Sequence, residues 1–92
     1  MDRRKYIVKG IVQGVGFRPF IFNLASSLNL SGFVLNSPAG VVIEAEGPET
    51  DLDDFTRRIS AEAPALSRII SFSAAKIPVT NQPGFIILKS EE

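Results

Sequence analysis

Hydrophobic and polar residues alternate along residues 6–12 and then recur at a helical spacing after Pro19. The even-numbered positions of the first stretch fall on one face, and its β-branched content favours a strand. In the second stretch, apolar residues three and four positions apart predict a helix that ends near Leu30, with Gly32 as its break. The apolar stripe of this helix consists of Phe20, Ile21, Leu24, Ala25 and Leu28.

The middle of the chain predicts a hairpin and then a second helix. Residues 33–35 and 41–46 have strand patterns, and residues 37–40 between them read Ser-Pro-Ala-Gly, which is typical of a turn. Thr50, followed three positions later by Asp53, predicts a capping arrangement at the start of the second helix. The expected core face of this helix consists of Leu52, Phe55 and Ile59.

Three aspartates gather in the first turn of the second predicted helix, and such a cluster could in principle bind a metal ion. They are Asp51, Asp53 and Asp54. Arg57 and Arg58 lie four residues after Asp53 and Asp54, a spacing that favours ion pairs on one helix face. Acidic residues also interact favourably with the positive end of the helix dipole. We therefore interpret the cluster as helix stabilisation and predict no metal site.

Strand patterns at residues 69–77 and 85–89 complete the chain, and the tail at 90–92 is expected to fray. The predicted order is β-α-β-β-α-β with an extra terminal strand. Right-handed crossovers in such a chain place both helices on one face of an antiparallel sheet. The sequence therefore predicts an α+β protein, a ferredoxin-like α/β sandwich, formed by a single domain that spans residues 1–92.

Composition narrows the chemistry available to this domain. Ten basic and ten acidic residues leave no net charge, which argues against capture of nucleic acid or of an anionic membrane. The chain has no cysteine and no histidine, so thiol nucleophiles and the commonest general base are absent, and we expect no cofactor. The apolar runs are too short for a transmembrane helix, and residues 1–5 lead into a strand, so a cytoplasmic location is expected.

The connection between the first strand and the first helix combines glycines, an arginine and a helix start. Gly14 and Gly16 permit a tight loop with inward-pointing N–H groups, and Pro19 suits the first turn of a helix, whose N-terminus favours negative charge. Arg18 offers a planar fork that can bind two oxygens of a phosphate or carboxylate. These features predict an anion-binding cradle, although such glycines can also form only a tight connection. The dinucleotide and nucleotide P-loop motifs do not match.

Two segments resemble the acylphosphatase family: residues 10–18, which read GIVQGVGFR, and residues 32–47, which read GFVLNSPAGVVIEAEG. The resemblance covers nearly the whole chain and implies the same fold, with an acyl phosphate or inorganic phosphate as ligand. It implies that Arg18 binds the phosphoryl group and that Asn36 positions the attacking water. It also implies that a phosphate-binding loop is formed by the backbone amides of Gln13, Gly14, Val15, Gly16, Phe17 and Arg18.

Residues 16–20, with the ending at 85–90, further resemble the N-terminal domains of the carbamoyltransferases that mature nickel-iron hydrogenases. This branch implies carbamoyl phosphate as substrate and a domain excised from a longer chain. Its partners would be the downstream domains and other hydrogenase maturation proteins. A free-standing general acylphosphatase and a non-catalytic phosphate-binding module remain as alternatives. An RNA-binding module is disfavoured, because one tyrosine and no clustered strand aromatics give no surface for stacking bases.

Overall fold

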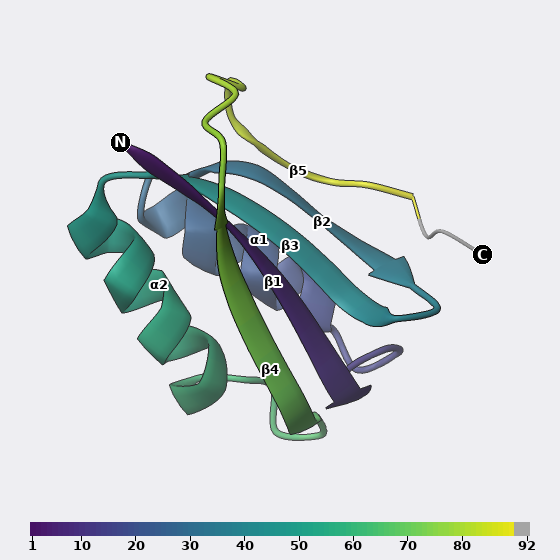
Figure 1. Cartoon of the computed structure of the whole chain (residues 1–92). Helices are drawn as coiled ribbons and strands as arrows, with labels where there is room; N and C mark the ends of the chain where they lie inside the picture. The colour runs from purple at the N-terminus through teal and green to yellow at the C-terminus, as the bar shows by residue number, and fades with distance from the viewer. Residues whose placement is uncertain (90–92) are drawn as a thin grey trace.

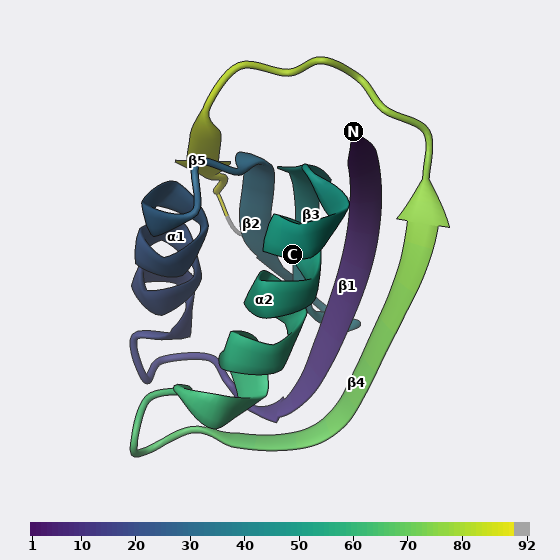
Figure 2. The ribbon, with the colours of Figure 1, turned by 90° about the vertical axis from the view of Figure 1, so that its left-hand side faces the viewer.

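In the computed structural model, which describes residues 1–89, five strands form one sheet and two helices cover one of its faces (Figures 1 and 2). The predicted fraying of residues 90–92 lies outside the described residues. In chain order the elements are β1 (Asp2–Ile11), α1 (Phe17–Ser27), β2 (Ser31–Ser37), β3 (Gly40–Gly47), α2 (Glu49–Ala61), β4 (Arg68–Ile77) and β5 (Phe85–Ile87). This order confirms the predicted ferredoxin-like βαββαβ fold with its terminal strand.

The strand order across the sheet is β4-β1-β3-β2-β5. The prediction of an antiparallel sheet holds for β1 to β4, whereas β5 pairs with β2 in parallel and makes the sheet mixed. The reason is the connection at residues 78–84, which crosses one end of the sheet, so that β5 sets out in the opposite direction to β4 (Figure 1). Because β3 runs antiparallel to both β1 and β2, the last residues of β1 and β2 lie at the same end of the sheet.

The core lies between the sheet and the two helices, as the apolar periodicity predicts. Tyr6 and Val8 of β1 are fully buried, and the ring of Phe55 meets that of Tyr6 edge-on at 5.6 Å between centroids. The predicted face of β3 is buried as well, which places the alternate residues of this strand on the opposite face of the sheet. The other buried core residues of β3 and the helices are Val41, Ile43, Ala45, Phe17, Ile21, Leu24, Ala25, Leu52 and Ile59.

The first helix ends earlier than predicted, and its break is an asparagine. The helix stops at Ser27, and Asn29 takes the left-handed conformation with φ of 55°. Asparagine tolerates this region better than most residues, and the N–H of Leu30 then donates to the carbonyl of Ala25 at 2.9 Å. Gly32 is not the break: it lies inside β2, where a Cβ would collide with the backbone of β3. Neither described helix is long and apolar enough to cross a membrane.

The predicted cap of the second helix is wrong. The residue before the helix is Pro48, and no side chain there hydrogen-bonds to the first turn. Thr50 is already the second helical residue, so its hydroxyl cannot occupy the cap position. The extended backbone of Pro48 sets the start of the helix instead, because its fixed φ of −59° leads directly into the first helical residue, Glu49.

The aspartates of the second helix form ion pairs, only partly as predicted. Asp54 pairs with Arg57 and, at 3.6 Å, with Arg58. The predicted pairing of Asp53 with Arg57 is wrong, because Asp53 instead accepts a hydrogen bond from Arg4 of β1 at 2.8 Å. The even-numbered side chains of β1 face the helices, so this cross-element partner could not be seen from helix spacing. Residues 1–89 contain no group of three or more His, Cys, Asp or Glu that could hold a metal ion.

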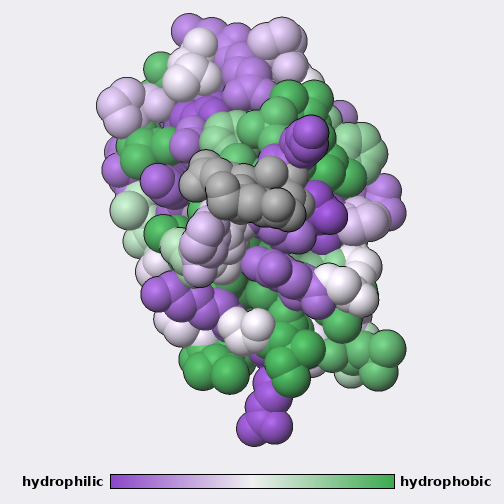
Figure 3. Space-filling model, turned by 90° about the vertical axis from the view of Figure 1, so that its right-hand side faces the viewer, coloured by the Kyte–Doolittle hydropathy of each residue, from purple (hydrophilic) through white to green (hydrophobic). Residues whose placement is uncertain are grey.

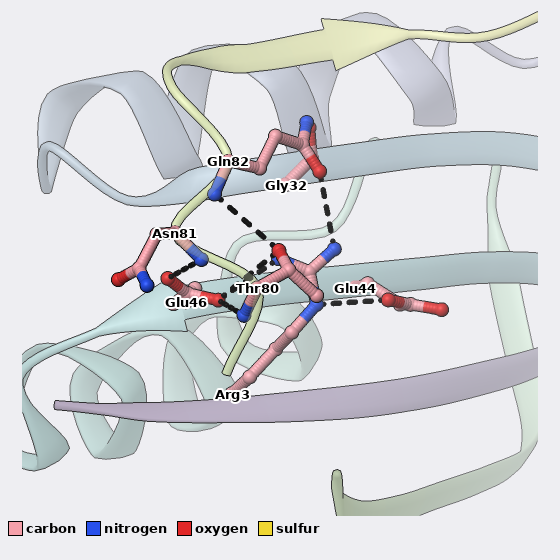
Figure 4. A network of polar contacts seen from close by, with 7 residues as sticks. All are labelled: Arg3, Gly32, Glu44, Glu46, Thr80, Asn81 and Gln82. Atoms are coloured by element: carbon pink, nitrogen blue, oxygen red, sulfur yellow. Dashed lines mark hydrogen bonds and ion pairs between the residues drawn. The ribbon is translucent and has the colours of Figure 1, made fainter. Parts of the chain in front are cut away.

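A buried ion-pair network fastens the connection between β4 and β5 to the start of β1 (Figure 4). Arg3 and Glu46 have exposed fractions of only 1% and 4%. The Arg3 guanidinium donates to Glu46 at 3.1 Å and to Glu44 at 2.9 Å. The backbone N–H groups of Thr80 and Asn81 donate to the two carboxylate oxygens of Glu46 at 2.8 and 3.0 Å. The network therefore supplies a partner for each carboxylate oxygen of Glu46.

The same network changes the titration of Glu46. The hydrogen bond from the Thr80 N–H lowers the pKa of this carboxyl most strongly, burial opposes the change, and the charge-assisted bond from Arg3 lowers the pKa further. Gln82 extends the network to β2, since its side-chain N–H donates to the Gly32 carbonyl at 2.7 Å. This end of the sheet is thus closed by a paired polar cluster beneath the crossover.

Candidate active site

The loop between β1 and α1 makes a tight turn around two glycines. Gly14 and Gly16 have φ of 75° and 80°, in the left-handed region that side chains with a Cβ rarely adopt. Apart from the two flanking residues, no residue has an atom within 4 Å of the position that a Cβ would occupy at either glycine, so the backbone conformation, not the space, requires glycine here. The glycine spacing thus gives the chain the sharp turn that it makes before the helix.

The N-terminus of α1 opens beside this loop without a side-chain cap. Gly16 occupies the cap position and has no side chain to accept a hydrogen bond from the first-turn N–H groups. Phe17, Arg18 and Pro19 follow as the first three helical residues, and Pro19 has no N–H to satisfy. The helix dipole adds partial positive charge at this point. The local arrangement is therefore suited to an anion.

Buried side chains hold the loop in place on both sides. Val12 before the glycines and Phe17 after them are almost completely buried, with exposed fractions of 2% and 1%. Val15 packs against the core between them, and the ring of Phe17 lies 5.7 Å from that of Phe20. Arg18 is half-buried directly after this anchor. The loop backbone and the start of the guanidinium side chain are consequently preorganised by the core, which an anion site requires.

Asn36 contributes the one buried side-chain polar atom that has no hydrogen-bond partner within residues 1–89, its Oδ1. The residue lies near the end of β2, opposite Val41 of β3, and faces the same side of the sheet as buried Val34. Leaving a buried acceptor unpaired costs about 1 to 3 kcal/mol. Unsatisfied groups of this kind are rare in folded proteins, and functional sites are among the places where they occur.

A hydrogen bond joins the loop to the strand that carries Asn36. The Gln13 amide donates to the backbone carbonyl of Ser37 at 3.4 Å. The Ser37 hydroxyl in turn donates to the Gly40 carbonyl and accepts from the Ala39 N–H, both at 3.1 Å, which fixes the turn. The structure therefore brings the predicted loop residues and Asn36 to the same end of the sheet. Figure 3 looks onto the side of the molecule with this turn, where hydrophilic and hydrophobic residues interleave.

Sequence reasoning did not single out a cavity of about 430 Å³ between the end of β1 and the β2–β3 turn. The cavity adjoins the glycine loop, because Gln13 belongs to both. A basic residue immediately before the GIVQGVG segment was the available signal, but only the tertiary structure brings Lys9 beside the turn, where its Cγ lies 3.1 Å from the position of a Cβ at Gly40. The lining residues are Lys9, Gly10, Ile11, Val12, Gln13, Pro38, Ala39 and Gly40.

The sequence pattern of the acylphosphatase family matches residues 4–87. The chain belongs to the acylphosphatase family. It is 46% identical over 88 residues to the carbamoyltransferase HypF of Rhizobium leguminosarum bv. viciae, an alignment that covers 96% of this chain and 11% of that protein. The family assignment confirms the resemblance seen in the two sequence motifs, and the domain is an acylphosphatase.

Solved structures of a long and a short protein of this family have the same fold. A full-length HypF, crystallised in a phosphate- and nucleotide-bound form, superposes with a TM-score of 0.93 at 41% identity, covering 98% of this chain and 12% of HypF. The acylphosphatase from Bacillus subtilis superposes with a TM-score of 0.90 at 34% identity, covering 96% of this chain and 99% of that enzyme. The chain spans about a tenth of the length of the carbamoyltransferases that it matches.

Proposed function

We propose that this acylphosphatase domain hydrolyses carbamoyl phosphate as the N-terminal domain of a cytoplasmic carbamoyltransferase that matures nickel-iron hydrogenases. The observation that carries the proposal is the buried, unpaired Oδ1 of Asn36 at the same end of the sheet as the glycine loop and Arg18. The phosphoryl group requires an anion-binding loop, and the attacking water requires an unpaired acceptor. Both features lie at this end of the sheet. The similarity to HypF proteins supports carbamoyl as the acyl group.

The phosphoryl group would bind to the loop and the start of α1. Backbone N–H groups between Gln13 and Arg18 would donate to its oxygens, and the Arg18 fork would bind two of them. Phosphoryl transfer depends mainly on positioning and on stabilising charge at the phosphoryl oxygens. The uncapped helix N-terminus and the guanidinium supply positive charge for this purpose, and the buried anchors Val12 and Phe17 hold the loop in position.

Asn36 would hold the nucleophilic water. Its Oδ1 accepts a hydrogen bond from the water, which turns a lone pair of the water oxygen toward phosphorus. As the new oxygen–phosphorus bond forms, the bond between phosphorus and the acyl oxygen breaks. The electron pair of that bond stays on the acyl oxygen, and the acyl group leaves as carbamate. The proton of the water passes to a phosphate oxygen of the substrate. Because carbamate is a good leaving group, the reaction needs no strong protein base.

Hydrolysis of carbamoyl phosphate in water enriched in heavy oxygen tests this proposal. Phosphate release, corrected for spontaneous decomposition of the substrate, should require Arg18, and one heavy oxygen should enter the phosphate. Replacement of Asn36 by alanine should lower kcat while the inhibition constant of inorganic phosphate stays the same. Phosphate without heavy oxygen would contradict attack at phosphorus. A folded domain that binds phosphate through Arg18 without turnover would identify a non-catalytic binding module.

A general acylphosphatase is the second candidate, favoured by the near full-length match to the short Bacillus subtilis enzyme. The two candidates differ in how strongly the site selects the acyl group. A carbamoyl-specific domain should show a clearly higher kcat/KM for carbamoyl phosphate than for acetyl phosphate. Equal kcat/KM values for the two substrates would establish the general enzyme in its place.

A further inference from the structure

A cavity adjoins the glycine loop at the end of the sheet that carries Asn36. It is formed by the last residues of β1 and by the β2–β3 turn, and it meets the loop at Gln13. The side chain of Gln13 bridges these two walls through its hydrogen bond to Ser37. A phosphoryl group held by the loop would therefore have the cavity as a neighbour on the Gln13 side.

Lys9 is the charged residue in the lining of this cavity, which contains no acidic side chain. Within residues 1–89, its ammonium group makes no hydrogen bond or ion pair. The acidic residues of neighbouring β3, Glu44 and Glu46, lie toward the opposite end of the strand and pair with Arg3. The cavity is thus a basic site without a counter-charge of its own.

Gly40 shapes the wall of the cavity on which Lys9 lies. A Cβ at this position would approach the Val8 carbonyl oxygen to 2.5 Å and the Lys9 Cγ to 3.1 Å, and the glycine has φ of 125°. A larger residue would push the lysine stem away from the turn. The absence of a side chain at Gly40 therefore lets the Lys9 stem lie across the end of the hairpin, beside the cavity.

We propose that this cavity is the leaving-group site of the domain and that Lys9 binds the carboxylate that forms there. The inference rests on the proposed function. When the bond between phosphorus and the acyl oxygen breaks, the electron pair stays on that oxygen and the acyl group leaves as an anion. Arg18 and the loop amides stabilise the phosphoryl oxygens, whereas Lys9 stabilises the opposite side of the breaking bond.

The lining also defines the class of acyl group. Gly10, Ala39 and Gly40 leave room for a small or flat group, and Gln13 offers an amide beside it. A single cation and no acidic residue favour acyl groups that leave as a simple carboxylate or carbamate. Positively charged acyl groups, such as an aminoacyl group, would be repelled by Lys9.

Hydrolysis of benzoyl phosphates with different ring substituents tests the role of Lys9. The substituents change the pKa of the benzoic acid that forms from the leaving group, with little change in the shape of the substrate. Without the cation, negative charge on the leaving oxygen is less stabilised. Lys9→Met should therefore lower kcat/KM about 10- to 100-fold for the poorest leaving group, and less for the best one. The plot of log kcat/KM against leaving-group pKa should become steeper. Lys9→Arg should retain most of the activity.

Two further measurements separate a charge effect from a structural one. Inhibition by the product benzoate should weaken in Lys9→Met, whereas inhibition by inorganic phosphate should stay the same. Lys5→Met is the matched control, since Lys5 lies on the same strand and is exposed but does not line the cavity. This variant should behave like the original protein in every assay.

The outcomes distinguish the two proposals. An unchanged slope and unchanged benzoate inhibition in Lys9→Met, with turnover still dependent on Arg18, would overturn the leaving-group site and leave the proposed function in place. An original protein that does not hydrolyse any acyl phosphate would overturn the proposed function and the leaving-group site together. An equal loss for all leaving groups would also reject Lys9 as the group that binds the leaving carboxylate.

Discussion

The two ends of the sheet differ in whether their buried polar groups have hydrogen-bond partners. At the start of β1, the Arg3–Glu46 network gives both carboxylate oxygens of Glu46 a hydrogen-bond partner beneath the crossover. At the other end, the Oδ1 of Asn36 is buried without a partner among the described residues, and the N-terminus of α1 has no side-chain cap. The same small fold thus contains one buried polar cluster whose groups are hydrogen-bonded and one site with a buried acceptor and a helix N-terminus that lack side-chain partners.

This difference in hydrogen bonding predicts that the two ends of the sheet contribute to different properties of the protein. Removing one partner of a buried ion pair lowers the free energy of unfolding of the protein by about 3 to 5 kcal/mol, because the other charge is left buried without a partner. A buried acceptor without a hydrogen-bond partner already lowers the stability of the protein by about 1 to 3 kcal/mol, and removing it leaves no other group unpaired. Substitutions at the Arg3 end should therefore affect the free energy of unfolding, whereas substitutions at the Asn36 end should affect turnover.

The largest effect is expected for Arg18→Ala. We expect kcat/KM for an acyl phosphate to fall about 10³-fold or more, because an arginine that stabilises a phosphoryl transition state contributes on this scale. Phosphate inhibition should be lost as well, and Arg18→Lys should recover little because lysine lacks the planar fork. Steady-state kinetics with Arg57→Ala as an exposed-arginine control would measure this. A loss of less than tenfold would rule out Arg18 as the phosphoryl ligand.

Arg3→Ala should have the opposite signature. The free energy of unfolding should fall by about 3 to 5 kcal/mol, because Glu46 would remain buried without its cation. Kinetic constants per folded molecule should not change. Urea unfolding should be compared with Arg4→Ala, whose ion pair with the largely exposed Asp53 should contribute about 1 kcal/mol or less. Equal destabilisation by the two substitutions would show that the buried network has no special role.

Asn36→Ala should lower kcat about 10²-fold and leave phosphate binding intact, because in the proposed mechanism Asn36 orients the water. The free energy of unfolding should stay the same or rise by up to about 1 kcal/mol, since an unpaired acceptor is removed. Asn23→Ala, on the exposed face of α1, is the control. Kinetics and urea unfolding of the same samples would test both parts, and marked destabilisation would indicate a structural role for Asn36.

The smallest effect is expected for Glu46→Gln and depends on pH. Because folding lowers the pKa of Glu46, its stabilising contribution is complete above the pKa of the unfolded chain and is lost as the pH falls through the folded pKa. The variant should therefore be less stable by about 2 kcal/mol at pH 7, on the scale of hydrogen bonds to charged groups. Urea midpoints at several pH values should converge in acid. A difference that persists at low pH would contradict this linkage.

The sequence by itself determined the features that depend on near neighbours in the chain. Apolar periodicity specified both helices and the faces of the central strands, because burial follows periods of 3.6 and two residues. The spacing of Gly14 and Gly16 specified the turn, since only a backbone without Cβ enters the left-handed region easily. The two motifs around Arg18 and Asn36 were sufficient for the family, which the match to residues 4–87 confirms.

Only the tertiary structure decided which distant side chains meet. Arg3 and Arg4 are adjacent in a charged N-terminal segment, yet β1 sends one beneath the crossover to Glu46 and the other toward Asp53. The unpaired state of Asn36 Oδ1 and the position of Lys9 beside the hairpin likewise depend on strand pairing. Burial and pairing of polar groups are properties of contacts between elements, so no local pattern determines them.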